Sequence, residues 1–268
     1  MGPAEALATK IAGTGARLDD PSCHVQPHQE RAVFGHFCGI SKQLWCLFAV
    51  AGLIVGCQTA ATMLPTVTPR ATAQRPVLEL PPPLTDGAMS LETALQKRRS
   101  IRAYTDEVVA LQDIAQLFWS AQGITRSWGG RTAPSAGALY PLELYAATAN
   151  GVYHYLPGQH QAKLWLAKDI RQSLWAAGLR QEALKQAPVV FIVTAVYGRT
   201  SAKYGDRSER YVKLEAGHAA QNLLLQAVTL GLGAVPIGAF DDEGISAALA
   251  LPSDEQPLYL ISVGHPAE

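Results

Sequence analysis

Hydrophobic and polar positions divide the chain into a C-terminal part with regular periodicity and an N-terminal part without it. From Met89 onward, apolar residues recur at the spacings of helices and strands. Before that point the chain holds one short apolar run and then a stretch with six prolines. The pattern predicts an N-terminal extension (residues 1–57), an extended proline-rich linker (58–88) and one folded domain (89–268).

Several helices of the domain are indicated by apolar residues at helical spacing. Ser90 indicates the N-cap of the first, with an acidic residue in the following turn. Further helices are predicted over residues 111–122 and 169–186. The helix predicted over residues 209–230 is apolar around nearly its whole circumference, which is typical of a helix buried in a core or an interface.

Strand signals lie between these helices. The runs LELYAATA and VYHY flank Asn150-Gly151, a strong signal for a hairpin turn. Pro188 opens VVFIVTAVY, whose unbroken apolar character is typical of a buried central strand. Short strands are predicted over residues 235–237 and 258–263. Together these elements predict an α+β structure in which helices pack on a sheet.

Charge and cysteine content narrow the function classes. The 268 residues include 22 basic and 22 acidic side chains, so the formal net charge is zero. This balance argues against a nucleic-acid-binding protein that relies on a large basic surface. All four cysteines lie at or before residue 57. We therefore expect neither a disulfide nor a thiolate metal site in the folded domain.

The apolar run LWCLFAVAGLIVG, residues 44–56, resembles the hydrophobic part of a signal peptide. Its 13 residues are too few for an ordinary transmembrane helix, which needs about 20, and Lys42 supplies a preceding positive charge. The run leads into IVGC, which is similar to the bacterial lipobox. That resemblance implies lipidation at Cys57 and a lipid-anchored protein of the cell envelope that faces the periplasm. The alternatives are a buried helix or a single-pass anchor, and a cytoplasmic location.

Most familiar catalytic motifs are missing. The chain has no GxxxxGK[ST] phosphate loop, and GLGAVPIG (residues 231–238) follows a predicted helix rather than opening one. Glu215 and His218 form one ExxH pair, whereas a di-iron bundle needs two. We therefore expect no metal site, and we expect both side chains to serve helix packing and hydrogen bonding.

The cluster QKRRSIRAY is the first candidate for ligand chemistry. Arg98, Arg99 and Arg102 surround Ser100 at the point where a predicted helix ends. Guanidinium groups bind phosphate with two parallel hydrogen bonds, and a serine hydroxyl adds another. Taken alone, such a charge run is more often a solvated basic patch.

Four motifs in order resemble the nitroreductase-like flavoprotein superfamily: RRSIRAY, APSAGALYP, LEAGHAAQN and GLGAVPIGAF, between Ser90 and Gly264. Within it, KYGDRSERYVKLEAGHAAQNLLLQA is similar to the SagB/ThcOx branch, which includes FMN dehydrogenases that oxidise peptide azolines to azoles. The resemblance implies a nitroreductase-like mixed β-sheet flanked by helices, with FMN bound at a homodimer interface. The helix over residues 209–230 is then the natural interface element.

The resemblance also implies where FMN binds. Arg98, Ser100 and Arg102 match positions that hold the phosphate, the ribityl chain and the N1/C2 edge of the ring, and Arg99 matches a further contact position. Small residues along the ring let the backbone approach it closely, and a later loop offers a backbone N–H to flavin N5. The positions that match these two loops are Pro134, Ser135, Ala136, Gly137, Gly238 and Ala239.

Lys203-Tyr204 resembles the pair assigned to proton transfer in the azoline-oxidising branch. When hydride leaves one carbon, a base must remove the proton on the neighbouring carbon, and a tyrosine beside a lysine suits that task. The alternative is that KYGDRSER is a polar, mobile loop on the surface.

Three function classes follow. The leading one is an FMN-dependent oxidoreductase of the SagB-like branch that transfers hydride between flavin N5 and a small-molecule or peptide substrate. The second is an NAD(P)H-dependent nitro or quinone reductase, which a cytoplasmic location would favour because the periplasm lacks NAD(P)H. The third is a non-catalytic lipoprotein that uses the fold as a binding module. No nucleic-acid partner is expected, and the membrane is contacted only through the lipid anchor.

Overall fold

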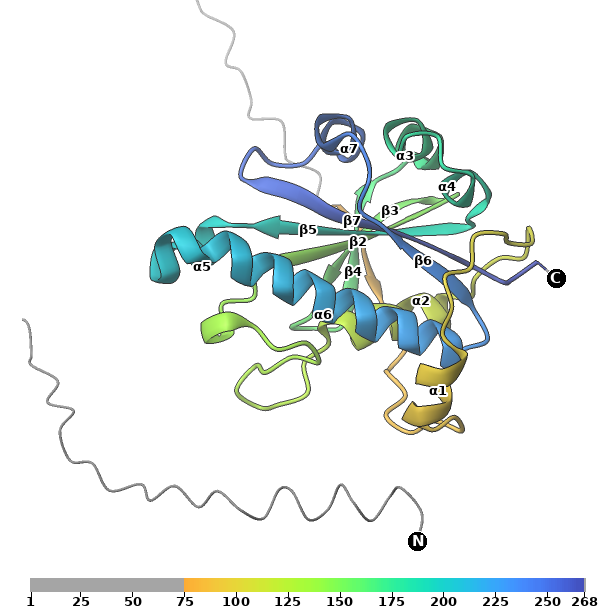
Figure 1. Cartoon of the computed structure of the whole chain (residues 1–268), viewed down its shortest axis with the longest axis horizontal. Helices are drawn as coiled ribbons and strands as arrows, with labels where there is room; N and C mark the ends of the chain where they lie inside the picture. The colour runs from red at the N-terminus through yellow and green to blue at the C-terminus, as the bar shows by residue number, and fades with distance from the viewer. Residues whose placement is uncertain (1–74, 268) are drawn as a thin grey trace, which may run out of the picture. The chain divides into compact units, whose positions relative to one another are not determined.

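The computed structural model describes residues 75–267, which form a seven-stranded sheet with helices on both faces (Figure 1). Neighbouring strands are antiparallel, in the order β1-β4-β3-β2-β5-β7-β6. The predicted signal peptide, the predicted lipidation site Cys57 and residues 58–74 of the predicted linker lie outside the described residues. The strands are β1 (Val77–Glu79), β2 (Leu142–Thr148), β3 (Gly151–Leu156), β4 (Gln161–Leu166), β5 (Val189–Val196), β6 (Gly233–Ile237) and β7 (Glu255–Gly264).

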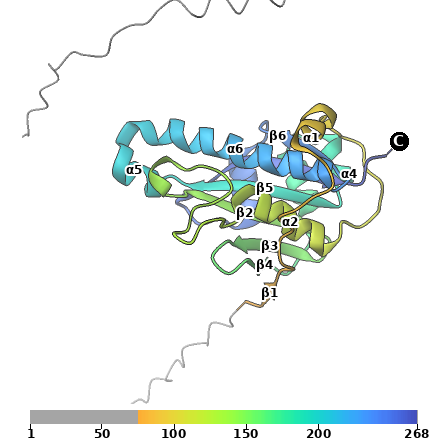
Figure 2. The same ribbon diagram turned by 90° about the horizontal axis from the view of Figure 1, so that it is seen from below.

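The helices cover the sheet in two layers. Figures 1 and 2 show α1, α2, α5 and α6 on one face, and Figure 1 shows α3, α4 and α7 on the other. In the part of the chain that the structure describes, no helix combines the length and the apolar character needed to cross a membrane. The helices are α1 (Leu91–Lys97), α2 (Leu111–Gln122), α3 (Arg171–Ala177), α4 (Glu182–Gln186), α5 (Gly198–Tyr204), α6 (Ser208–Thr229) and α7 (Asp242–Leu249).

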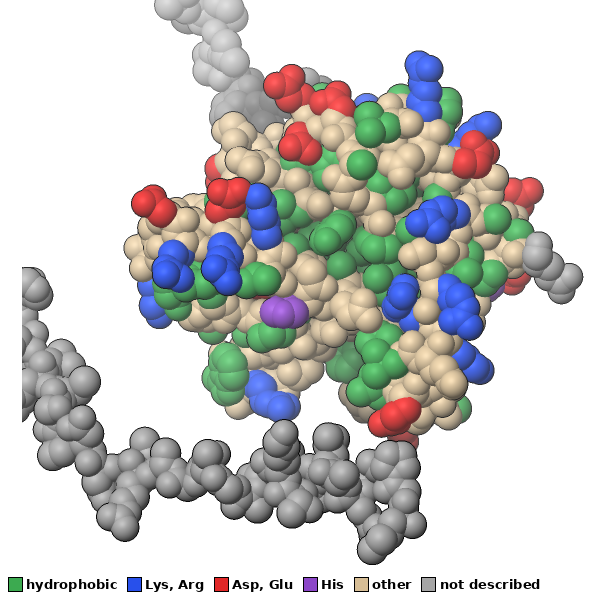
Figure 3. All heavy atoms as spheres, in the orientation of Figure 1, with side chains coloured by type: hydrophobic (Ala, Val, Ile, Leu, Met, Phe, Trp, Pro, Cys, Tyr) green, Lys and Arg blue, Asp and Glu red, His purple; other side chains and the backbone are tan. Residues whose placement is uncertain are grey.

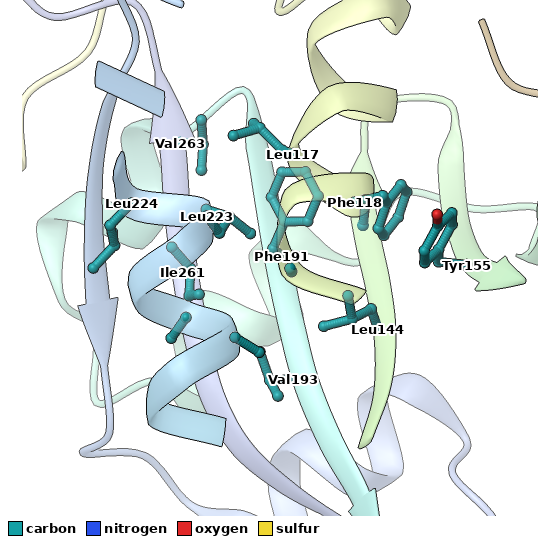
Figure 4. Close-up of a cluster of buried hydrophobic side chains, with 14 of the residues drawn as sticks. Leu117, Phe118, Leu144, Tyr155, Phe191, Val193, Leu223, Leu224, Ile261 and Val263 are labelled. Atoms are coloured by element: carbon teal, nitrogen blue, oxygen red, sulfur yellow. The ribbon is translucent and has the colours of Figure 1, made fainter. Parts of the chain in front are cut away.

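Alternate residues of the central strand β5 enter two separate cores. Phe191 and Val193 belong to the core with α2 and α6, whereas Val190 and Ile192 belong to the core with α3, α4 and α7. Figure 4 shows Phe191 near Phe118 of α2, and their ring centroids lie 5.1 Å apart, edge to face. Burial on both faces explains why this strand is an unbroken apolar run.

The hairpin, the capped first helix and the long helix predicted from local signals are confirmed. β2 and β3 pair up to Thr148 and Gly151, with Asn150 in the turn between them. The Ser90 hydroxyl accepts a hydrogen bond from the Thr93 N–H (3.2 Å) and caps α1. The long helix α6 lies within one residue of the predicted bounds 209–230.

The helix predicted over residues 169–186 is wrong, because the structure breaks it into α3 and α4. Leu179 and Arg180 both have left-handed backbones, with φ of 56° and 55°. The Arg180 N–H donates to the Trp175 carbonyl (2.9 Å), which closes the end of α3. Gly178, inside the predicted helix, stands at the C-cap position where glycine is a common helix stop.

The folded domain begins earlier than Met89. β1 pairs with β4 along the edge of the sheet, and Leu80 is part of the core with α2 and α6. Further on, the Leu84 N–H donates to Gln116 Oε1 (2.8 Å), and Gln116 Nε2 donates to the Leu84 carbonyl (2.9 Å). Residues 77–84, predicted to be linker, therefore belong to the domain.

Candidate functional site

The segment that follows α1, residues 98–104, carries three arginines and is called the arginine segment. It lies along the outer edge of β6. Ser100 forms a parallel bridge with Ala234, and the Ile101 N–H donates to the Ala234 carbonyl (3.1 Å). Tyr104 anchors the segment, because its hydroxyl donates to the Ile101 carbonyl (2.6 Å) and lies 2.9 Å from the Ser262 hydroxyl. Burial raises the pKa of Tyr104 to about 12, so the hydroxyl keeps its proton and the anchor is stable across neutral pH.

The arginine side chains of this segment have different surroundings. Arg99 donates from its guanidinium to the carbonyls of Gln96 and Lys97, both at 3.2 Å, and so closes the C-terminal end of α1. Arg102 is exposed, and its guanidinium makes a long contact of 3.4 Å with a backbone carbonyl of the segment. Arg102 is therefore better placed for a ligand than Arg99.

Arg102 shares a cavity of about 380 Å³ with the loop that follows β6. Gly238 and Ala239, both predicted contacts, line this cavity. The Gln181 side-chain amide donates to the Ala239 carbonyl (2.8 Å) and holds the loop from the turn between α3 and α4. The structure thus brings together residues from opposite ends of the domain. Sequence reasoning missed Gln181 because it placed this residue inside one continuous helix.

The small-residue loop, residues 131–140, meets the C-terminal end of α5. Gly137 has a left-handed backbone (φ 63°), and a Cβ added there would lie 2.9 Å from the Tyr204 hydroxyl and 3.1 Å from the Lys203 ammonium. Lys203 and Tyr204 belong to helix α5 rather than to a polar loop. The predicted catalytic pair therefore lies beside Gly137, one of the predicted flavin contacts.

Within one chain Ser135 of the small-residue loop and helix α1, which leads into the arginine segment, approach α6 at different turns. Ser135 interacts with α6 at Glu215, whereas α1 lines a cavity with α6 residues near Gln226, together with Thr132 at the start of the loop. A rise of about 1.5 Å per residue separates these positions by about 16 Å. In Figure 1 the yellow-green helical turn Ala136–Ala138 and α1 lie near opposite ends of α6. One chain thus presents the predicted contacts in two separate groups, or half-sites.

The ExxH pair on α6 does not converge on one point. Glu215 is buried, with 3% of its surface exposed, whereas His218, one turn later, is exposed. Within residues 75–267, no group of three His, Cys, Asp or Glu side chains is placed to hold a metal ion. The buried Glu215 instead belongs to a polar cluster beneath the small-residue loop.

Comparison with known proteins gives consistent matches over the domain. The sequence profile of the nitroreductase family matches residues 95–265. A protein of Methanocaldococcus jannaschii named as a nitroreductase is 41% identical over 186 residues, which cover 67% of this chain and 93% of that protein. A solved structure from Ralstonia eutropha, also described as a nitroreductase, is 31% identical, has a TM-score of 0.66, and aligns over 74% of this chain and 92% of that one.

Two more distant relatives have names that specify a cofactor or a process. The FMN reductase (NAD(P)H) of Bacillus subtilis is 26% identical over 192 residues, which cover 65% of each protein. The microcin B17-processing protein McbC of Escherichia coli is 32% identical over 114 residues, which cover 38% of this chain and 42% of that protein.

Proposed function

The chain belongs to the nitroreductase family, and from this we propose that it is an FMN-dependent oxidoreductase that moves hydride between an organic substrate and the flavin. The observation that supports the proposal most strongly is the cavity shared by Arg102, Gly238 and Ala239. These three residues lie far apart in the sequence, and each matches a predicted flavin contact. The relative named as an FMN reductase adds support for the cofactor.

The residues of both half-sites fit a flavin nucleotide. Arg98 and Arg102 carry guanidinium groups suited to a phosphate. The absence of a side chain at Gly137 lets the loop lie against the Tyr204 hydroxyl and the Lys203 ammonium, because an added Cβ would lie 2.9 Å and 3.1 Å from them. When bound, FMN supplies a flat ring that accepts or releases hydride. The chain itself would bind and orient the FMN. The arginines would hold the phosphate, and Gln181 fixes the loop after β6.

We propose that Lys203 and Tyr204 move the proton that accompanies hydride transfer. The Lys203 ammonium lies 5.5 Å from the centre of the Tyr204 ring. That ring packs edge-on against Tyr211, with 5.1 Å between ring centroids. This packing holds the Tyr204 hydroxyl beside Gly137, where a substrate lying on the loop would meet it.

We propose that two chains combine their half-sites in a homodimer. The arginine segment of one chain would then meet the 131–140 loop of the other. Large hydrophobic side chains are exposed on α6 and α1, including Leu214 (51% exposed) and Leu91 (61% exposed), and Figure 3 shows hydrophobic side chains between separate groups of basic ones on this face. Sedimentation of the FMN-loaded chain should give the mass of a dimer, and a flavin-loaded monomer would overturn this assembly.

The substrate class is tested by asking what reduces the bound flavin without oxygen. We propose the SagB-like branch, on the resemblance around Lys203-Tyr204 and the match to a microcin-processing protein. A synthetic thiazoline peptide should then bleach the flavin as it loses hydride and a proton to become a thiazole. Bleaching by NADH or NADPH alone would favour the nitro or quinone reductase instead. A chain that binds no FMN would leave only the non-catalytic binding module.

We also propose that the protein is lipid-anchored at Cys57, as the resemblance of IVGC to the lipobox implies. In a periplasmic location, oxygen or a quinone would have to accept the electrons. Cells expressing the chain should attach labelled palmitate to it, and Cys57→Ser should abolish the label. Equal labelling of both proteins would contradict the anchor.

Replacing Gly137 by alanine is expected to reduce turnover of a reactive substrate by about tenfold. The added Cβ would displace the Tyr204 hydroxyl and the Lys203 ammonium, and misplacing a reacting group costs rate. Gly231→Ala is the matched control, because Gly231 also has a left-handed backbone (φ 73°) but nothing within 4 Å of an added Cβ. Both variants should lose about 1 kcal/mol of stability. Equal turnover in both would argue against the role of the Gly137 contact.

A further inference from the structure

Glu215 is a buried carboxyl group that the proposed reaction does not use. It lies in the middle of α6, and its Oε1 has no hydrogen-bond partner within residues 75–267. A buried polar atom without a partner is costly and needs an explanation. Packing alone does not supply one, because an apolar side chain would fill the same position without this cost.

The surroundings of Glu215 form a polar cluster beneath the 131–140 loop. Arg131 donates from Nη1 to Gln122 Oε1 (2.8 Å). In the described part of the chain, the Arg131 Nε and Gln122 Nε2 atoms are also buried without a hydrogen-bond partner. Arg131 attracts the Glu215 carboxylate, but no ion pair joins the two among the described residues. The cluster therefore places a carboxyl group near a cation without neutralising it by contact.

The loop above this cluster is closed through Tyr140. The Arg131 N–H donates to the Tyr140 hydroxyl (3.2 Å), and the Arg131 guanidinium lies 4.4 Å from the centre of the Tyr140 ring. The Tyr140 N–H donates to the Ser135 hydroxyl oxygen (2.9 Å). Ala138 and Tyr140 have left-handed backbones, with φ of 55° and 47°. Such strain persists only where the surrounding contacts over-determine the conformation, so the loop depends on what lies beneath it.

We propose that Glu215 is a positioning residue: its protonated carboxyl lets the 131–140 loop close over it, and its ionisation favours an open loop. Any effect of Glu215 on flavin binding rests on the proposed function, because the same loop carries the proposed flavin contacts. The opening of the loop itself is a property of the protein alone.

The direction of the effect follows from burial. Burial raises the pKa of Glu215 to about 7 from its ordinary value of 4.5, although the Ser135 hydroxyl and the Arg131 guanidinium act in the opposite direction. A loop that opens and hydrates the carboxyl restores the ordinary pKa, so opening releases a proton. The closed loop is therefore most stable below pH 4.5, loses stability as pH rises to about 7, and changes little above that.

Other charged groups near the cluster do not reproduce this behaviour. Arg131 stays charged at all these pH values, and Glu143 and Arg199 act on Arg131 from β2 and α5. His154 lies 2.7 Å from Glu143 through a hydrogen bond between their side chains. These groups are the same in any variant at position 215, so comparison with such a variant cancels their effects.

The test is amide hydrogen exchange in the full chain and in Glu215→Gln at pH 5 and pH 8. The Ala138 and Tyr140 amides report the loop, because both donate hydrogen bonds within it, and the Phe191 amide of β5 reports global unfolding. The ratio of wild-type to variant exchange at the loop should rise by at least about tenfold between the two pH values. Dividing by the variant's rate removes the chemical pH dependence of exchange.

The control is Glu209→Gln, an exposed carboxyl on the same helix that pairs with Lys213, which should behave like the wild type. If the ratio of wild-type to Glu215→Gln exchange rates changes by less than about twofold between pH 5 and pH 8, the role proposed for Glu215 is wrong. FMN titration of the wild type and of Glu215→Gln separates the role of Glu215 in the loop from the proposed FMN-dependent function. Failure of FMN to bind either protein refutes the proposed function, while the exchange ratio still decides the role of Glu215.

Discussion

Replacing Arg98 and Arg102 together by glutamine is expected to weaken FMN binding by about a hundredfold or more. A hydrogen bond to a charged group contributes about 1.5–3 kcal/mol, so two lost contacts amount to at least about 3 kcal/mol, and each 1.4 kcal/mol is tenfold in affinity. Both arginines lie on the segment that runs beside β6, and Arg102 lines the cavity with Gly238 and Ala239. Fluorescence titration of FMN into the flavin-free protein measures the change.

The matched control for the arginine pair is Arg126→Gln. Arg126 is an exposed arginine whose guanidinium donates to the carbonyl of the adjacent Thr125 (3.1 Å). Its replacement should leave FMN affinity within about twofold of the wild type. The double variant should also lose most of the salt dependence of binding, because screened charges no longer contribute. A double variant that binds like the control would place the phosphate elsewhere.

Replacing Tyr204 by phenylalanine is expected to lower turnover by about a hundredfold, while the flavin stays bound. The change removes only the hydroxyl, which is the group beside Gly137, and keeps the ring that packs on Tyr211. A positioned general acid or base contributes about 10²–10⁴-fold to a rate. Stopped-flow reduction of bound FMN by a thiazoline peptide, without oxygen, would measure the loss.

Tyr211→Phe provides the comparison for Tyr204→Phe, because it removes the equivalent hydroxyl from the tyrosine of α6 that packs against Tyr204. We expect Tyr211→Phe to retain turnover and both variants to retain FMN. If the two variants lose turnover equally, the Tyr204 hydroxyl has no special role in proton transfer. If only Tyr204→Phe is slow, and replacing Lys203 by methionine has a similar effect, the pair acts as proposed.

The elements that sequence analysis predicted correctly are those that local pattern determines. Asn150-Gly151 fixes a hairpin by its own turn geometry, and the unbroken run of β5 requires burial on both faces. β1 was missed because it has only three residues and gains its strand pairing from β4. The break between α3 and α4 depends on two left-handed residues that are not glycine, which local propensity does not anticipate.

The same division applies to the candidate site. The arginines and the small-residue loop have compositions that indicate their chemistry, so a sequence motif could identify them. Gln181 matters only because a turn brings its amide to the Ala239 carbonyl. Glu215 matters only because the fold buries it beneath Ser135 and beside Arg131. Contacts between residues this far apart in the sequence depend on the complete fold, and a single sequence does not reveal them.

The most direct test of the central claim is an FMN titration of the flavin-free chain, followed by its absorption spectrum. The account predicts saturable binding of one FMN per chain and bands near about 370 and about 450 nm, the absorption range of oxidised flavin. It also predicts that the Arg98 and Arg102 double variant loses this binding. A protein that retains no flavin absorbance after excess FMN has been removed would contradict the account and leave a nitroreductase fold without flavin chemistry.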